Sequence, residues 1–158
     1  HDLHALIHCL GNVDMVGTKE PNILIADADR SSVDEMEAML KERGMSESDY
    51  TPLIDSLCTV PSHAGDLALE NSLKAFFKAK NIKIKEDVST LIATDTLPFL
   101  AKVPVTSIIL FNEKMKGDVL EFAPCYHQAC DTVDLIDPQS LALSSEAVVY
   151  LLKSLNVK

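Results

Sequence analysis

The feature that most constrains the fold is the continuous apolar and β-branched run Val105–Phe111. Such a run is typical of a central strand that is buried on both faces of its sheet. Three other segments favour strands: Leu6–Val16, which should be buried and ends before Gly17; Ile23–Ala26, expected to form a hairpin or an adjacent pair with it; and Ile82–Lys85, whose alternation suits a half-exposed strand. We therefore expect a sheet of several strands.

Two helical patterns lie between these strands. Ser32 and Glu35 make a capping box, and apolar residues at helical spacing then continue up to Gly44. A second helix is predicted over 66–80, with Glu70 on its polar face. Strands that alternate with helices indicate an α/β fold.

The length and composition of the chain suit one domain. At 158 residues and 47% hydrophobic composition, the chain can bury a single core, so one domain over 1–158 is expected. Residues 45–65 carry many turn-forming residues and are predicted to be a long loop with one short helical turn at most. A final helix should follow Asp137 and Pro138, which suit the N-cap and the first helical position.

Charge and hydropathy exclude several classes of partner. The net charge of −10 opposes binding to nucleic acid and to anionic membrane surfaces. No apolar run approaches the roughly 20 residues that a membrane-spanning helix needs. The first four residues, His1-Asp2-Leu3-His4, hold neither a methionine nor a basic segment, so the chain is expected to be a processed or excised piece.

The cysteines give a signal through their spacing. Cys125 and Cys130 are close enough to form a disulfide if a turn brings the sulfurs together, and such a bond would point outside the cytosol. A redox pair fits less well, because thiol oxidoreductases usually place two residues between their cysteines at a helix N-terminus. Cys9 and Cys58 are expected to be buried thiols that behave as small hydrophobes.

Two distant segments offer metal ligands. His127 and Asp14 supply the imidazole nitrogen and carboxylate oxygen that zinc accepts. Asp14 ends an apolar strand, where open α/β sheets place ligand crevices, although an aspartate before a glycine turn also commonly closes that turn. The phenol of Tyr126 could donate to a developing oxyanion. The alternative for 125–132 is a stapled turn without chemistry, and the three histidines of the first eight residues are not expected to converge.

These segments resemble the secreted zinc aminopeptidases, the aminopeptidase Y-like family of exopeptidases with two co-catalytic zinc ions. Asn12-Val13-Asp14-Met15-Val16-Gly17 resembles the family's Asn-x-Asp-Met-x-Gly strand end. Cys125 to Thr132 is similar to its Cys-Tyr-His-x-x-Cys-Asp-Thr loop. Between them, Thr94–Phe99 and Val103-Pro104 resemble its Ser-Asp-His-x-Pro-Phe and Gly-x-Pro segments.

The resemblance implies the C-terminal part of a three-layer fold with a central mixed sheet flanked by helices. Residues 30–65 are longer than the family's usual link and would be a helical and loop insertion, either a lid that adjusts specificity or, as we favour, cover for an open sheet edge. Asp14 would ligate one zinc ion and His127 the other, while Tyr126 would polarise the scissile carbonyl or hold the tetrahedral intermediate. The implied activity is zinc-dependent removal of N-terminal amino acids from peptides by a secreted or periplasmic enzyme.

Part of the family's site has no counterpart in this chain. The His-x-Asp ligand, the bridging aspartate and the Glu-Glu pair are absent from the sequence, and Thr94-Asp95-Thr96 replaces Ser-Asp-His. The chain alone is therefore expected to be inactive and to need the missing N-terminal half of the domain as its partner, with possible self-association through an open sheet edge. The alternative is a non-catalytic, binding or structural member of the same fold.

Overall fold

The computed structural model describes residues 8–112, 114–116 and 119–155. Within these residues a four-stranded sheet has the order β1-β4-β2-β3. Its strands are β1 (Leu10–Asp14), β2 (Asn22–Ile25), β3 (Lys85–Glu86) and β4 (Val105–Phe111). β4 pairs in parallel with β1 and antiparallel with β2, so the sheet is mixed. The predicted central strand is confirmed at its predicted bounds, and nearly all of its side chains are buried.

The two strands that follow each other first along the chain are not neighbours in the sheet. β4 lies between them, with Asp14 of β1 opposite Ile109 and Ile25 of β2 opposite Ile108. The predicted hairpin or adjacent pair is therefore wrong, because a strand from much later in the sequence separates the two. β1 is also not the buried strand that its apolar sequence predicted: Val13 is 40% exposed. The strand predicted over Ile82–Lys85 is largely wrong, because only Lys85 of it lies in a strand, the two-residue β3.

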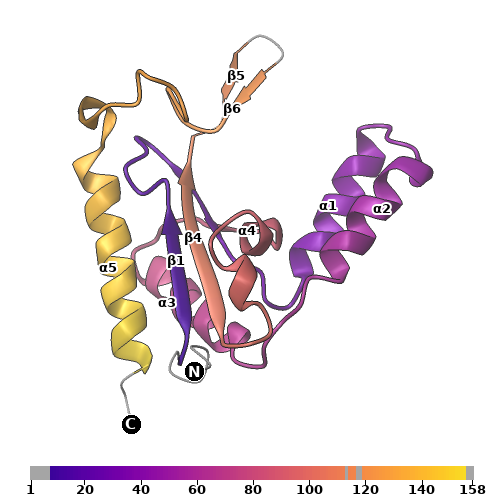
Figure 1. The fold of residues 1–158 in the computed structure, drawn as a ribbon, viewed down its shortest axis with the longest axis horizontal. Coiled ribbons are helices and arrows are strands. Elements are labelled where there is room, and N and C mark those ends of the chain that lie inside the picture. The colour runs from indigo at the N-terminus through magenta and orange to yellow at the C-terminus, as the bar shows by residue number, and fades with distance from the viewer. Residues whose placement is uncertain (1–7, 113, 117–118, 156–158) are drawn as a thin grey trace.

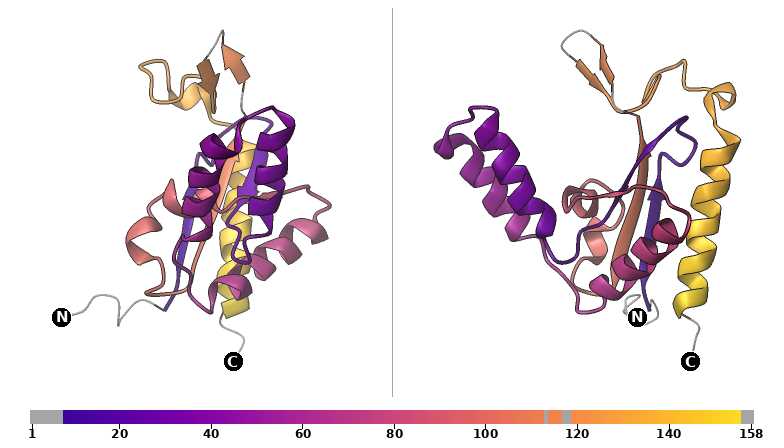
Figure 2. Two further views of the ribbon diagram at one scale, coloured as in Figure 1. Left: turned by 90° about the vertical axis from the view of Figure 1, so that its right-hand side faces the viewer. Right: turned by 180° about the vertical axis from the view of Figure 1, so that it is seen from behind.

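Helices cover both faces of the sheet (Figures 1 and 2). On one face, α3 (Asp66–Ala79) and α5 (Pro138–Leu155) pack with Leu73, Phe77, Ile108 and Leu151 in a buried cluster. On the other face, α1 (Ser31–Glu42), α2 (Glu47–Cys58) and α4 (Ser89–Ile92) share a second cluster that includes Val105. Because successive residues of a strand face opposite sides, β4 contributes to both clusters. The result is a three-layer α/β arrangement, as predicted.

α1 and α2 form a helical hairpin that leans away from the sheet at its far end (Figure 1). Gly44, at φ 78°, ends α1 as predicted. The capping box is wrong: Arg30 is the N-cap residue, and Ser32 is buried, with its Oγ accepting the N–H of Val88 at 3.3 Å. The predicted loop over 45–65 is also wrong, because α2 occupies most of it.

The sequence of α2 explains why local patterns did not reveal it. Pro52 lies inside the helix and removes a helical donor, which is a strong signal against a helix. The helix is nevertheless stabilised by burial of Tyr50, Ile54 and Leu57, which face the same cluster as α1. Cys58 ends α2 and is exposed, contrary to the expectation of a buried thiol, whereas Cys9 is half-buried and its burial raises the pKa of the thiol.

The last part of the chain returns to the sheet through irregular structure. Two short strands, β5 (Lys114–Lys116) and β6 (Val119–Glu121), pair with each other outside the main sheet. A short 3₁₀ helix, Val133–Leu135, precedes α5, and another, Leu97–Phe99, lies before β4. α5 begins as predicted, with Asp137 accepting the N–H groups of Gln139 and Ser140. None of the helices among the described residues is long and apolar enough to cross a membrane.

Candidate functional site

A cavity of about 660 Å³ opens beyond the carboxyl end of β1. Its walls come from three segments: the turn after β1, the loop that carries the two cysteines, and the start of α5. Asp14, Tyr126 and His127 all line it, so the structure brings together the site residues that the sequence suggested. β1 pairs in parallel with β4, so both strands have their carboxyl ends at the same end of the sheet. Asp14 therefore lies at the end from which the chain leaves β4 toward the cysteine loop (Figure 1).

Asp14 has one carboxylate oxygen in use and one available. Its Oδ1 accepts the N–H of Met15 at 2.8 Å, and Met15 adopts φ 53°. Thr18 then closes the turn by donating its N–H and its hydroxyl to the carbonyl of Met15. Asp14 therefore does close its turn, but its Oδ2 has no hydrogen-bond partner among the described residues, and its side chain is exposed.

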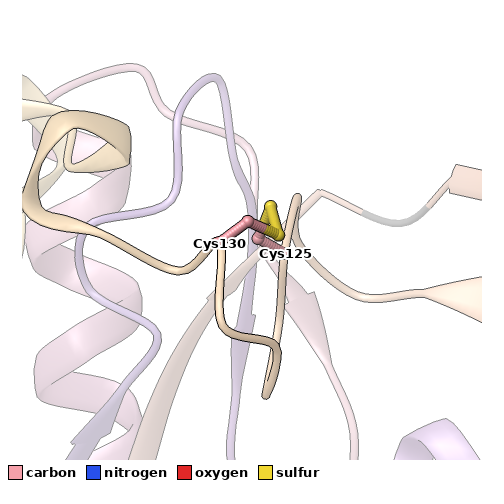
Figure 3. The surroundings of a disulfide bond; sticks show 2 residues. All are labelled: Cys125 and Cys130. Atoms are coloured by element: carbon pink, nitrogen blue, oxygen red, sulfur yellow. A yellow bond between two sulfur atoms is a disulfide. The ribbon is translucent and has the colours of Figure 1, made fainter.

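The predicted disulfide between Cys125 and Cys130 is present and closes the loop that bears Tyr126 and His127 (Figure 3). The Cα atoms of the two cysteines are 5.4 Å apart. Inside the loop, the N–H of Gln128 donates to the carbonyl of Cys125 at 2.9 Å. These two links hold a tight turn, so the short segment has a defined backbone.

Three non-glycine residues in the segments around this cavity have a left-handed backbone conformation. Met15, Cys125 and His127 have φ values of 53°, 63° and 56°, in the left-handed region that non-glycine residues rarely adopt. Each such residue costs on the order of 1 kcal/mol and persists only where the surroundings enforce it. The disulfide and the turn hydrogen bonds provide that constraint, and strain of this kind is typical of sites that must present a side chain in a fixed direction.

Tyr126 and His127 form one aromatic wall of the cavity. Their rings are stacked, with centroids 3.9 Å apart and planes at 18°. Phe122 packs edge-on against Tyr126, with ring centroids 6.1 Å apart. The imidazole remains exposed while its neighbour orients it, which leaves its ring able to meet a ligand.

The start of α5 is fastened to the turn after β1. The N–H of Asp137 donates to the carbonyl of Gly17 at 2.8 Å. A Cβ at Gly17 would lie 3.1 Å from Cγ2 of Ile136, so a side chain there would press on this contact. Asp137 lines the cavity, but its oxygens cap α5, and hydrogen bonding from Ser140 lowers the pKa of its carboxyl. We therefore regard it as a structural carboxylate.

The donor chemistry of the cavity fits zinc in part. Asp14 offers an oxygen and His127 a nitrogen, which are ordinary zinc ligands. Asp131 and Asp134 also line the cavity, and sequence reasoning assigned them no role. No group of three or more His, Cys, Asp or Glu ligand atoms within 4.8 Å of one another forms at this cavity among the described residues. Asp14 and His127 by themselves therefore offer fewer donors than the three or four protein ligands of an ordinary zinc site.

A close group of carboxylates does form elsewhere, at the end of β2. Asp27, Asp29, Glu70 and Glu86 have ligand atoms within 4.8 Å of one another. Sequence reasoning missed it, because it placed Glu70 on the exposed face of its helix, whereas that side chain is fully buried. The one available signal was Asp27-Ala28-Asp29, which follows an apolar strand.

Comparison with known proteins gives one family. The model of peptidase family M28 matches residues 1–152, which is nearly the whole chain. No curated protein matches the chain.

Proposed function

The chain belongs to peptidase family M28, a family of zinc-dependent metallopeptidases, and on that premise we propose that it forms one wall of the active site of an aminopeptidase. The reaction would release N-terminal amino acids from peptides. The observation that carries the proposal is the shared cavity: Asp14, Tyr126 and His127 come from distant parts of the sequence and line one hollow at the carboxyl end of β1.

In this proposal Asp14 and His127 hold zinc. Asp14 offers Oδ2, since Oδ1 is occupied by the N–H of Met15, and His127 offers a ring nitrogen from its exposed imidazole. When bound, zinc polarises a carbonyl and lowers the pKa of a water molecule. Tyr126 donates its phenolic proton in a hydrogen bond to the oxygen that becomes negative on the scissile carbonyl.

The charge of the cavity supports the exopeptidase assignment. Beside the proposed ligand Asp14, Asp131 and Asp134 contribute carboxylates that hold no metal in this proposal, against the single lysine Lys19 among the described lining residues. This excess of negative charge favours the α-ammonium end of a peptide over its carboxylate end. A peptide that enters by its N-terminus would thus present its first peptide bond near the aromatic wall.

The remaining ligands and the catalytic base are assigned in this proposal to the N-terminal half of the domain. The outer edge of β1 is unpaired among the described residues, and we assign to it the pairing with that half. The Cys125–Cys130 disulfide favours an oxidising compartment, so we place the enzyme outside the cytosol, as a secreted or periplasmic protein. Self-association through the same edge is the competing use of that surface.

A zinc titration of this chain, with and without the upstream half, tests the proposal. We expect tight binding of two zinc ions and release of an aminoacyl anilide only when both halves are present. Tight zinc binding that survives the double replacement Asp14→Asn and His127→Ala would contradict the assignment of the ligands. An intact polypeptide that supplies the other half but binds no zinc would overturn the peptidase proposal.

The lack of a third ligand beside Asp14 and His127 among the described residues favours a second candidate, a non-catalytic member of the same fold. That candidate predicts an intact protein without tightly held zinc. It also predicts that His127→Ala changes neither folding nor ligand binding. The same titration separates the two, because only the peptidase proposal requires stoichiometric metal.

A further inference from the structure

Four carboxylates converge where β2 ends, and we call them the acidic cluster: Asp27, Asp29, Glu70 and Glu86. They come from the segment after β2, from α3 and from β3. Lys74 contacts two of them, with its Nζ 2.5 Å from Glu70 and 2.7 Å from Glu86. A single ammonium group leaves most of the cluster's negative charge uncompensated.

Asp27 is the carboxylate of the cluster whose negative charge is least well matched. Its side chain is 0% exposed, and its Oδ2 accepts the N–H of Ser32 at 2.8 Å. Its Oδ1 has no hydrogen-bond partner in the part of the chain that the structure describes. Arg30 is close, but its guanidinium donates to the main-chain carbonyls of Asp27 and Val60. A buried carboxylate oxygen without a partner is costly, so a positive group or a proton is required there.

The chemistry of the cluster selects the kind of cation. Every donor is a carboxylate oxygen, which hard cations prefer, whereas zinc sites in proteins are rich in imidazole and thiolate. Oxygens bound to one calcium ion at about 2.4 Å lie at most about 5 Å apart, and around magnesium at most about 4 Å. Ligand atoms that all lie within 4.8 Å of one another fit inside a calcium shell. Four carboxylates at one point also suit calcium, which takes six to eight oxygen ligands, better than magnesium, which is usually held by one or two carboxylates and keeps several waters.

We propose that the acidic cluster binds one divalent cation of the calcium class, which joins β2, β3 and α3. Asp29 is exposed and gives the ion a route from solvent and room for bound water. Asp27 supplies its unpaired Oδ1, and Glu70 and Glu86 share their charge between the ion and Lys74. Because Asp27 also holds the N–H of Ser32, the ion would anchor the base of α1 as well.

This site is separate from the cavity at the end of β1. β1 and β2 run in opposite directions on either side of β4, so their carboxyl ends point toward opposite ends of the sheet. The N–H of Ala26 donates to the carbonyl of Ser107, whereas Asp14 lies opposite Ile109. Two strand spacings alone put the two sites about 10 Å apart.

Calcium titration by calorimetry and by thermal unfolding, after treatment with a chelator, tests the proposal. We expect one Ca²⁺ per chain and a rise in the melting temperature, because a ligand that binds only the folded state stabilises it. Asp29→Asn should weaken Ca²⁺ binding at least about tenfold, since it removes one charged ligand. Asp34→Asn, an exposed residue of α1, is the matched control and should leave the affinity unchanged.

Lys74→Gln gives a second, opposite readout. It removes the competing ammonium from Glu70 and Glu86, so Ca²⁺ should bind more tightly than to the unaltered protein. Absence of Ca²⁺ binding in both proteins would mean that a proton satisfies Asp27 and would overturn the proposal, as would an unchanged affinity in Asp29→Asn. Asp14→Asn should leave the Ca²⁺ response intact, which separates this result from any failure of the peptidase assignment.

Discussion

Two aspartates near the carboxyl ends of strands of the same sheet have opposite environments. Asp14, at the end of β1, is exposed, and one of its carboxylate oxygens accepts a hydrogen bond within its own turn. Asp27, after the end of β2, is fully buried, and one of its carboxylate oxygens has no hydrogen-bond partner among the described residues. The segments that surround the two aspartates also differ. The first site is built from a strained turn and a disulfide loop, and the second from the packed ends of strands and of α3. Both sites carry carboxylates, and the first opens into a cavity of about 660 Å³.

The difference shows how a single sheet can use carboxylates for two purposes. An exposed carboxylate next to a cavity can bind and release a ligand, because water screens its charge at little cost. A buried carboxylate is held in a medium of lower dielectric constant, where its charge must be matched permanently. We therefore expect changes at the β1 site to affect activity, and changes at the acidic cluster to affect stability.

Replacement of His127 should have the largest effect on the β1 site. In the intact enzyme, His127→Ala should lower the rate of aminoacyl anilide hydrolysis by about 10³-fold or more, because the loss of a metal ligand removes several kcal/mol of transition-state stabilisation. The rate and the zinc content are the measurements. His8→Ala, at another exposed histidine, should leave both unchanged. Full activity in His127→Ala would show that this imidazole is not a ligand.

Tyr126 should separate chemistry from metal binding. Tyr126→Phe should lower kcat by about 10² to 10³, the usual cost of one oxyanion donor, with KM and zinc content little changed. Tyr150→Phe is the matched control, since that tyrosine lies on α5 and outside the cavity lining. If Tyr126→Phe instead releases zinc at unchanged kcat, its ring supports His127 and its phenol takes no part in the reaction.

In the absence of calcium, replacement of Glu70 should report on stability. Glu70→Gln keeps an acceptor for the N–H of Ala28 but removes the charge that faces Lys74, and should lower the free energy of unfolding by about 2 kcal/mol. Denaturant unfolding in a chelator measures it. Glu37→Gln breaks the exposed pair with Lys41 and should change stability by less than about 0.5 kcal/mol. An equal effect of the two substitutions would contradict the difference in burial.

Asp137 should give the smallest effect, and one that depends on pH. Hydrogen bonding from Ser140 lowers the pKa of Asp137 in the folded state below its ordinary value of 3.8. Its ionised form therefore adds stability above that value, and the contribution is lost as the pH falls through the lowered pKa. The difference in melting temperature between Asp137→Asn and the unaltered protein should be largest near neutral pH and vanish in strong acid. A difference that grows in acid would contradict this sign.

Several elements could be predicted from the residue types and spacings within a short segment of the sequence. The apolar run of β4, the N-cap of α5 at Asp137 and the short spacing of Cys125 and Cys130 each predicted what the structure contains. The amphipathic pattern of α3 was also correct in its apolar residues. In these cases the pattern of residue types within a few positions along the chain is enough to predict the element, although the partners that bury β4 and α3 lie far away in the sequence.

Local sequence failed where a distant partner decides. α2 forms despite Pro52, because burial of three of its side chains outweighs the lost donor. The predicted polar face of α3 contains Glu70, yet the N–H of Ala28 and the segment after β2 enclose that side chain. Helical periodicity assigns a residue to a face, but it does not reveal what covers that face.

The sequence by itself determined the α/β class, the disulfide loop and the residues Asp14, Tyr126 and His127 as site candidates, because residue types and short spacings carry that information. Only the tertiary structure decided that β4 separates β1 from β2 and that the carboxyl ends of those two strands point in opposite directions. Strand order depends on pairing between segments far apart along the chain. That pairing puts Asp14 beside an open cavity and encloses Asp27 among other carboxylates.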